Sequence, residues 1–340
     1  MKKNGLIFLS TLIFTSHLYA QSLNDSFDKF TQIYQQQLGS IQACDVTEDN
    51  TARVCSTVLK NDGNAPYILH HAQPTEKVVV LFHGLSDSPF YFKSIANAIH
   101  AQGNTVLVAL VPGHGKKDAD ADMQDPQLAQ RWYAHVDEIM DLAGDFGEQI
   151  YIGGFSTGGA LASRYVMINP SKVKGLLLFS GALALDSTVE SMANIWGVKW
   201  FAKTLDGDYQ TVGPNPFKYP SVARYSGFQL TDVIFDVRSL IEQEKPLALP
   251  IFVAHSMSDI TTPYFGVESL MAYNKGVNSV FKISKEFDVC HADVVVNQQQ
   301  VTEMAIDTSS MTEILPCSVP QANPQHAEML QSMLQFLANN

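Results

Sequence analysis

Charge, cysteine and long apolar stretches are all scarce in this sequence. Charged residues make up 16% of the 340 positions, and acidic residues outnumber basic ones by 34 to 22, giving a formal net charge of −12. A chain this acidic lacks the basic surface that attracts nucleic acids and anionic membranes. Its 4 cysteines form none of the close Cys-x-x-Cys pairs or Cys/His clusters typical of zinc sites. The composition therefore argues against nucleic-acid-binding and zinc-binding classes, and no metal is expected.

The longest N-terminal apolar run is short. Lys2 and Lys3 precede the apolar residues 6–14, and a polar break ends at Ala20. This order is typical of a secretory signal peptide over residues 1–20, and the run is too short for a comfortable membrane span. An uncleaved N-terminal anchor is the alternative. We expect an exported protein, periplasmic or secreted, whose mature chain is not stably inserted in a membrane.

Export makes the cysteines informative, because an oxidising compartment favours disulfides. Cys44, Cys55, Cys290 and Cys317 allow three pairings. Proximity in the sequence favours Cys44–Cys55 and Cys290–Cys317, each worth about 3 kcal/mol in the chain-entropy model.

Hydrophobic residues make up 46% of the chain, enough for one large α/β domain. Short apolar runs alternate with helical segments, which predicts a mostly parallel central sheet flanked by helices. Helices are expected over 126–146 and 324–337. The predicted strands cover residues 78–82, 105–110, 149–153, 174–179, 249–254 and 277–284.

Residues 21–74 are expected to form an N-terminal extension. Apolar residues at spacings of three and four across 22–38 predict an amphipathic helix on the outside of the main domain, or alternatively a partner-binding arm. Two extended stretches, 54–59 and 66–71, flank the turn residues 61–64 and predict a β-hairpin.

An insertion over residues 182–246 is predicted to divide the core into 75–181 and 247–340. A structureless loop of this length is improbable, so we expect a mainly helical cap. Most of its aromatic side chains should hold the cap together, and two or three should contact substrate. These aromatics are Trp196, Trp200, Phe201, Tyr209, Phe217, Tyr219, Tyr225 and Phe228.

The pattern Gly-x-Ser-x-Gly occurs at Gly154-Phe155-Ser156-Thr157-Gly158. A strand precedes it and a helix rich in small residues follows, which is the context of a nucleophile elbow. Such a corner exposes the serine hydroxyl and needs glycine on both sides. The pattern predicts Ser156 as a nucleophile.

A serine needs a general base and an orienting carboxylate, which in this architecture follow in the order acid, then histidine. Asp259 follows a late predicted strand, although it could also be only a loop or capping residue. His291 follows the last strand and is the favoured base. The rival is His326, in the first turn of the final helix, where a surface histidine is ordinary. His255 is expected to pack near Asp259.

Stabilising an oxyanion requires two backbone donors. One should be the N–H of Thr157, directly after the nucleophile. The other is expected from Leu85, in the loop after the first parallel strand. His83 and His114 belong to glycine loops and are expected to shape the site without exchanging protons.

The segments 83–89 (HGLSDSP), 112–115 (PGHG) and 154–159 (GFSTGG), followed by Asp259 and His291, resemble the α/β-hydrolase superfamily. More narrowly, the chain is similar to the bacterial carboxylesterase and monoacylglycerol-lipase group, often classed with serine aminopeptidase-like hydrolases. The resemblance implies an α/β-hydrolase fold, a catalytic triad of Ser156, Asp259 and His291, an oxyanion hole at Leu85 and Thr157, and no cofactor.

The expected function is that of an exported serine hydrolase acting on a small-molecule ester or lipid. Short- or medium-chain acyl esters and monoacylglycerols are favoured, with lysophospholipids as an alternative. An aminopeptidase would need carboxylates in the cap to hold a free amine, for which the candidates are Glu190, Asp206, Asp208 and Asp232. A hydrolase-fold binding protein without turnover is the alternative from another class. Oligomeric state is not indicated.

The segment 295–320 is long for this group and contains Cys317. A disulfide from Cys317 to Cys290 could stiffen the loop that carries His291, or it could only pin the inserted segment.

Overall fold

The computed structural model describes residues 23–45, 49–193, 198, 211–307 and 316–340. The predicted signal peptide lies outside these residues. So do four of the aromatics predicted for the cap, Trp196, Trp200, Phe201 and Tyr209, and the carboxylates Asp206 and Asp208. None of the described helices is long and apolar enough to cross a membrane.

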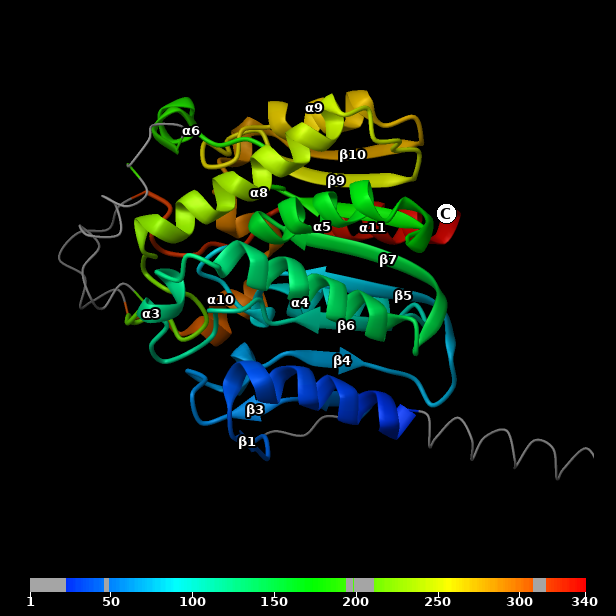
Figure 1. Ribbon diagram of the computed structural model, residues 1–340, viewed down its shortest axis with the longest axis vertical. Coiled ribbons are helices and arrows are strands. Elements are labelled where there is room, and N and C mark those ends of the chain that lie inside the picture. Colours follow the sequence, from blue (N-terminus) through cyan, green and yellow to red (C-terminus); the bar gives the residue numbers. More distant parts are fainter. Residues whose placement is uncertain (1–22, 46–48, 194–197, 199–210, 308–315) are drawn as a thin grey trace, which may run out of the picture.

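An eight-stranded sheet runs through the molecule in the order β10-β9-β8-β7-β5-β6-β4-β2 (Figure 1). Its strands β5 to β10 run parallel, whereas β4 is antiparallel to both β6 and β2. Each predicted parallel strand is present, with ends shifted by a few residues. The sheet strands are β2 (Thr51–Arg53), β4 (Tyr67–Leu69), β5 (Thr75–Phe82), β6 (Thr105–Ala109), β7 (Gly147–Phe155), β8 (Gly175–Phe179), β9 (Ile251–Ser256) and β10 (Asn278–Ile283).

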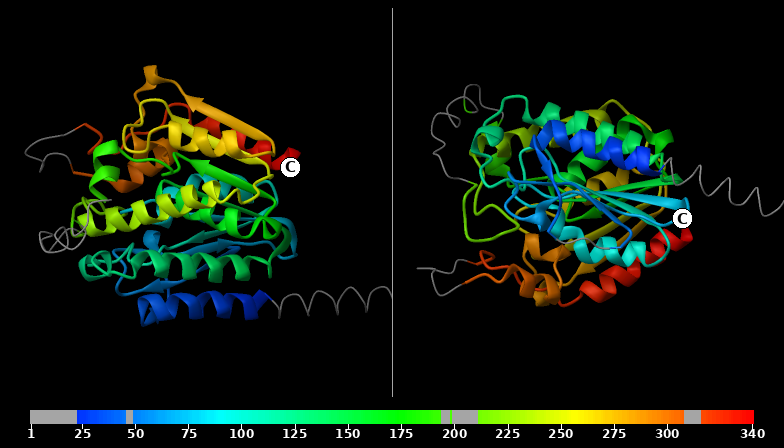
Figure 2. Two further views of the ribbon diagram at one scale, coloured as in Figure 1. Left: turned by 45° about the horizontal axis from the view of Figure 1, so that its top comes forward. Right: turned by 90° about the horizontal axis from the view of Figure 1, so that it is seen from below.

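Helices cover both faces of the sheet, which explains the unbroken apolar runs of its strands (Figure 2). In β5, Val78 and Val80 face one core, and Val79 and Leu81 face the other. The first core lies under the helix of residues 23–38 and α4 (Leu128–Ala143), α5 (Thr157–Ile168), α8 (Arg224–Glu242) and α9 (Phe265–Tyr273). The second lies under α2 (Lys93–His100), α10 (Gln298–Met304) and α11 (His326–Asn339). The mostly parallel sheet with helices on both faces, which the alternation predicted, is therefore confirmed.

The remaining described elements are short. They are β1 (Ile41–Gln42), β3 (Cys55–Ser56), α3 (Asp120–Met123), α6 (Ser187–Ala193), and the 3-10 helices η1 (Asp62–Asn64), η2 (Pro89–Phe92), η3 (Pro170–Lys172), η4 (Lys285–Phe287) and η5 (His291–Val295).

The N-terminal helix docks on the core, as its apolar spacing predicts. Its Phe30, Tyr34 and Leu38 are buried. The hydroxyl of Tyr34 lies 3.2 Å from Nε2 of His135 and accepts a hydrogen bond from the N–H of Leu110 at 3.0 Å. This contact ties the helix to the carboxyl end of β6.

The predicted hairpin is wrong in its first strand. The strand that pairs with β4 is β2, with Thr51 opposite Leu69 and Arg53 opposite Tyr67. Cys55 and Ser56 instead pair with β1, because the disulfide Cys44–Cys55 draws this stretch to the segment before it.

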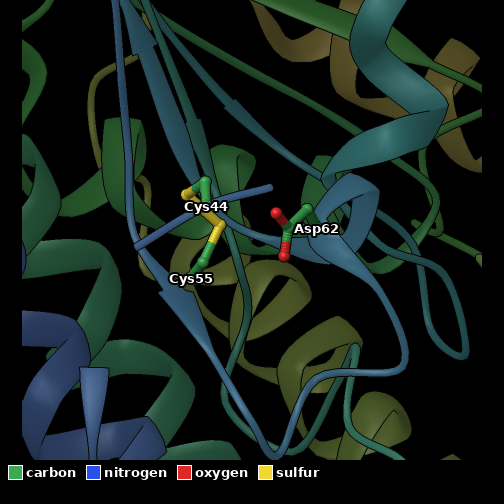
Figure 3. Close-up of side chains that lie close together, drawn as sticks. All are labelled: Cys44, Cys55 and Asp62. Atoms are coloured by element: carbon green, nitrogen blue, oxygen red, sulfur yellow. A yellow bond between two sulfur atoms is a disulfide. The ribbon is translucent and has the colours of Figure 1, made fainter. Parts of the chain in front are cut away.

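Both predicted disulfides, Cys44–Cys55 and Cys290–Cys317, are confirmed, and no cysteine is free. Figure 3 shows that the first lies beside the carboxylate of Asp62. Because both sulfur atoms are joined to each other, this cluster offers no thiolate to a metal.

The described part of the predicted cap contains α6, α8 and residues 211–223. Helix α8 packs against α4 and α5, with Val233 and Ile234 fully buried. Tyr219 and Phe228 are also buried, and the ring of Phe217 stacks on Phe90 at 3.6 Å between centroids. These aromatics serve packing, as expected for most of the set.

Candidate active site

Ser156 occupies the corner between β7 and α5. Its φ of 52° is in a region that non-glycine residues rarely adopt, and its N–H donates to the carbonyl of Phe179 at 3.1 Å. A Cβ on Gly154 would lie 2.2 Å from the carbonyl carbon of Gly158, and one on Gly158 would lie 1.7 Å from the oxygen of Phe82. Both glycines are thus required for steric reasons.

The structure brings Ser156, His291 and Asp259 together in one hydrogen-bonded line. Nε2 of His291 lies 2.9 Å from Oγ of Ser156, and Nδ1 lies 2.6 Å from Oδ2 of Asp259. An ionised Asp259 accepts from Nδ1–H, which leaves Nε2 as the acceptor for the serine hydroxyl. The three residues follow the ends of β7, β9 and β10, and parallel strands end at the same edge of a sheet.

Asp259 is held by the residues that follow it. Its Oδ1 accepts from the N–H groups of Thr261 and Thr262, each at 2.9 Å. The hydroxyl of Thr262 lies 2.9 Å from Oδ2 and 3.2 Å from Nδ1 of His291. The sequence did not single out Thr262, because the contacts of its hydroxyl with Asp259 and His291 form only in the folded chain.

The electrostatics favour an ionised Asp259. Burial alone would raise its pKa, but the facing His291 and the hydrogen bond to it outweigh burial and lower the pKa below its ordinary value. Beneath it, Nε2 of His255 is 3.8 Å from Oδ2, too far for a direct hydrogen bond. Burial lowers the pKa of His255 to about 4, so this ring is neutral at pH 7.

His326, the rival base, lies elsewhere and is not a surface residue. It is buried, and its Nε2 is 3.0 Å from the hydroxyl of Ser94 in α2. The expectation of an ordinary surface histidine was wrong because α11 packs its first turn against α2, a contact that helical spacing does not reveal.

His83 and His114 are fully buried beside each other, with ring centroids 5.0 Å apart. Nδ1–H of His83 donates to the carbonyl of Gly84 at 2.8 Å, and its Nε2 accepts from the N–H of Val111 at 3.1 Å. Burial, reinforced by His114, holds the pKa of His83 well below its usual value. A neutral His83 therefore braces the ends of β5 and β6.

The two predicted oxyanion donors lie on adjoining segments. Thr157 is the first residue of α5, where N–H groups have no acceptor within the helix. The close approach of Gly158 to Phe82 places this helix end against the end of β5. Leu85 follows in a turn closed by a hydrogen bond from the N–H of Asp87 to the carbonyl of Gly84, at 3.2 Å. Gly84 itself packs on the ring of Phe155.

Comparison with known proteins matches parts of this chain to a protein family and to individual relatives. Residues 73–227 match the model of a family described as serine aminopeptidase, S33. A probable carboxylesterase of Oryza sativa subsp. japonica is 37% identical over 79 residues, covering 21% of this chain and 34% of that protein. Acyl-protein thioesterase 1 of Kluyveromyces lactis is 28% identical over 141 residues, covering 35% of this chain and 62% of that protein. The matched regions thus span about a third and about three fifths of these relatives' lengths.

Solved structures match over more of the chain. A structure from work on the metagenome-derived lipolytic enzymes LipS and LipT has a TM-score of 0.57 at 16% identity, covering 78% of this chain and 95% of that one. A monoacylglycerol lipase of Paleococcus ferrophilus has a TM-score of 0.54 at 18% identity, covering 78% and 96%. At such identities the likeness concerns the fold. With the parallel sheet flanked by helices, it shows that this chain has an α/β-hydrolase fold.

Proposed function

We propose that this protein is a serine hydrolase that cleaves carboxylic esters through an acyl-enzyme. The observation that carries the proposal is the line from Oγ of Ser156 through the imidazole of His291 to Asp259, with distances of 2.9 and 2.6 Å. Such a line activates a hydroxyl that is otherwise a weak nucleophile.

In the first half-reaction Oγ attacks the ester carbonyl carbon, and its proton passes to Nε2 of His291. The N–H groups of Leu85 and Thr157 stabilise the oxyanion. The bond to the alkoxy oxygen then breaks, and that oxygen takes the proton from Nε2. In the second half-reaction water attacks the acyl-enzyme, His291 takes and returns one proton, and the acid leaves. Asp259 orients the ring throughout and stabilises the imidazolium.

Labelling with a fluorophosphonate tests the nucleophile. The wild-type chain should be labelled at Ser156, and Ser156→Ala should abolish labelling and turnover. Ser163→Ala is the matched control, since Ser163 is a buried serine of α5, the helix that follows Ser156, and its hydroxyl donates to the carbonyl of Gly159. A folded wild-type chain that neither labels nor turns over would instead favour the binding-protein alternative.

For the substrate we propose short- or medium-chain acyl esters or monoacylglycerols. An ester panel graded by acyl length, including lysophospholipids and run beside aminoacyl amides, tests this. A preference for aminoacyl amides would contradict it. Among the predicted amine-binding carboxylates, Glu190 is engaged by Arg238 through two contacts of 2.8 Å, an arrangement that disfavours its use for an amine.

We further propose that the chain is exported and processed after Ala20. The pair of disulfides supports an oxidising compartment. Mass spectrometry of the protein isolated from its source should give an N-terminus at Gln21. An intact N-terminus in a membrane fraction would support the anchor alternative.

A further inference from the structure

We propose that Lys218 is a positioning residue that holds the Leu85 loop in the shape needed for oxyanion stabilisation. The proposal rests on the proposed function, since it concerns the rate of the same reaction. It comes from a segment of the predicted cap, residues 215–219, which we call the strap.

The strap contacts successive residues of the turn that follows β5. The N–H of Tyr219 donates to the carbonyl of Ser86 at 2.8 Å. The hydroxyl of Ser88 donates to the carbonyl of Phe217 at 2.9 Å. Between these two contacts, the ammonium of Lys218 binds Oδ1 of Asp87. The residues after Leu85 are thus fixed one by one from a segment about 130 positions away.

The turn needs such support because its backbone is strained. Ser86 has a φ of 71°, a value that glycine adopts readily and serine does not. In a turn closed between Gly84 and Asp87, this is the position where type II geometry requires a positive φ. Relaxing Ser86 would change the shape of the turn between Gly84 and Asp87, and would thereby shift Leu85 together with its N–H.

The ion pair between Lys218 and Asp87 is largely buried. The side chain of Asp87 is 1% exposed and that of Lys218 27%. The other oxygen, Oδ2, has no hydrogen-bond partner among the described residues, and it packs against Gly84, where a Cβ would lie 2.4 Å away. The buried side chain of Asp87 therefore supports the turn through its contact with Gly84, and Lys218 is the cation that balances its charge.

The strap is itself anchored away from the site. Its Pro216 carbonyl accepts from the side-chain amides of Asn61 and Asn64, each at 2.8 Å. The hydroxyl of Tyr219 accepts from the N–H of Lys116 at 3.0 Å. The backbone that carries Lys218 is therefore held in place, as a positioning role requires.

The test compares Lys218→Met with Lys218→Arg in a steady-state ester assay. Oxyanion donors act mainly in the transition state, so kcat should fall by about 10- to 100-fold in Lys218→Met while KM changes less than about threefold. Lys218→Arg keeps the charge and should recover part of kcat. Lys93→Met is the matched control, because it removes another lysine ion pair, with Glu303 at 2.8 Å, outside the site. Its kcat should be unchanged.

Thermal unfolding of each variant separates positioning from loss of fold. If Lys218→Met does not fold, Asp87→Asn replaces it, because it removes the pair without leaving a buried unpaired charge, and the same fall in kcat is expected. Adding Lys218→Met to Asp87→Asn should then cost little more, since the two act through one contact. A folded Lys218→Met or Asp87→Asn protein with wild-type kcat overturns the inference. Absence of turnover and labelling in the wild type would instead defeat the proposed function.

Discussion

The Ser156 half of the candidate site and the Leu85 half differ in the origin of their supports. Ser156 and Asp259 are held mainly by near neighbours in the chain: Gly154 and Gly158 for the elbow, Thr261 and Thr262 for the carboxylate. The Leu85 turn is held by the strap, from a distant insertion. Local chain geometry thus places Ser156 and Asp259, whereas the shape of the Leu85 turn depends on tertiary packing.

The largest expected effect is loss of the base or the acid in the Ser156 half. His291→Ala and Asp259→Asn should each lower kcat by about 10⁴-fold, as for other serine triads, with circular dichroism unchanged. His326→Gln is the control, since its ring contacts Ser94 and lies outside the site. If His326→Gln were the variant that lost turnover, the assignment of His291 would be wrong.

Gly158→Ala probes the steric basis of the elbow. The added methyl would fall 1.7 Å from the carbonyl oxygen of Phe82, so we expect more than about 4 kcal/mol of destabilisation or no folded protein. Gly227→Ala, in α8 with nothing within 4 Å, should instead stabilise by about 0.5–1 kcal/mol. Urea unfolding measures both. A stable, active Gly158→Ala protein would contradict the close approach of α5 to β5.

The two disulfides can be removed separately. Cys290→Ser/Cys317→Ser and Cys44→Ser/Cys55→Ser should each cost about 3 kcal/mol in unfolding free energy. If the disulfide Cys290–Cys317 braces the loop of His291, the Cys290→Ser/Cys317→Ser variant should also lose turnover at a temperature where both variants are folded. The Cys44→Ser/Cys55→Ser variant should then keep its turnover. Equal turnover in the two variants would leave Cys290–Cys317 as a pin for the segment 295–320.

Thr262→Val tests the local support of the acid. It removes the hydroxyl that lies 2.9 Å from Oδ2 of Asp259 but keeps the side-chain shape. A loss of about one hydrogen bond to a charged group predicts a roughly 10-fold lower kcat. Thr261→Val is the control, because Thr261 is exposed and contributes only its backbone N–H to the carboxylate. Equal kinetics for the two variants would deny the hydroxyl a role.

Asp293 lies two residues after His291, and its carboxyl group interacts electrostatically with Lys218. Burial raises its pKa to about 7, against about 3.9 in an unfolded chain. The folded chain therefore holds more protons between these values, and its stability falls as pH rises from about 4 to 7. Asp293→Asn should flatten this fall and be more stable than wild type at pH 8, with little difference at pH 4. Asp288→Asn, at an exposed position, should follow the wild-type curve.

The same comparison explains what could be predicted from the sequence. The strands and the candidate positions Ser156, Asp259 and His291 follow from apolar runs and the residues just after them, which are local signals. The hairpin was misplaced, and His326 was wrongly taken for a surface residue, because a disulfide and a helix contact decide those positions. Thr262 is close to Asp259 in the sequence, but its contact with His291 depends on the folded chain. Lys218 had none, since only the folded chain brings the strap to Asp87.

The strap also bears on how such a protein could be modified or diverge. The predicted cap is the natural place to exchange residues in order to change the acyl group that the protein accepts. Here one stretch of that segment also grips the turn that carries Leu85. A transplanted or shortened cap would thus have to hold the Leu85 turn as well as change the substrate selectivity. Grafted variants that retain residues 215–219 should keep their kcat. Variants that replace these residues should have a lower kcat, even where they accept a wider range of substrates.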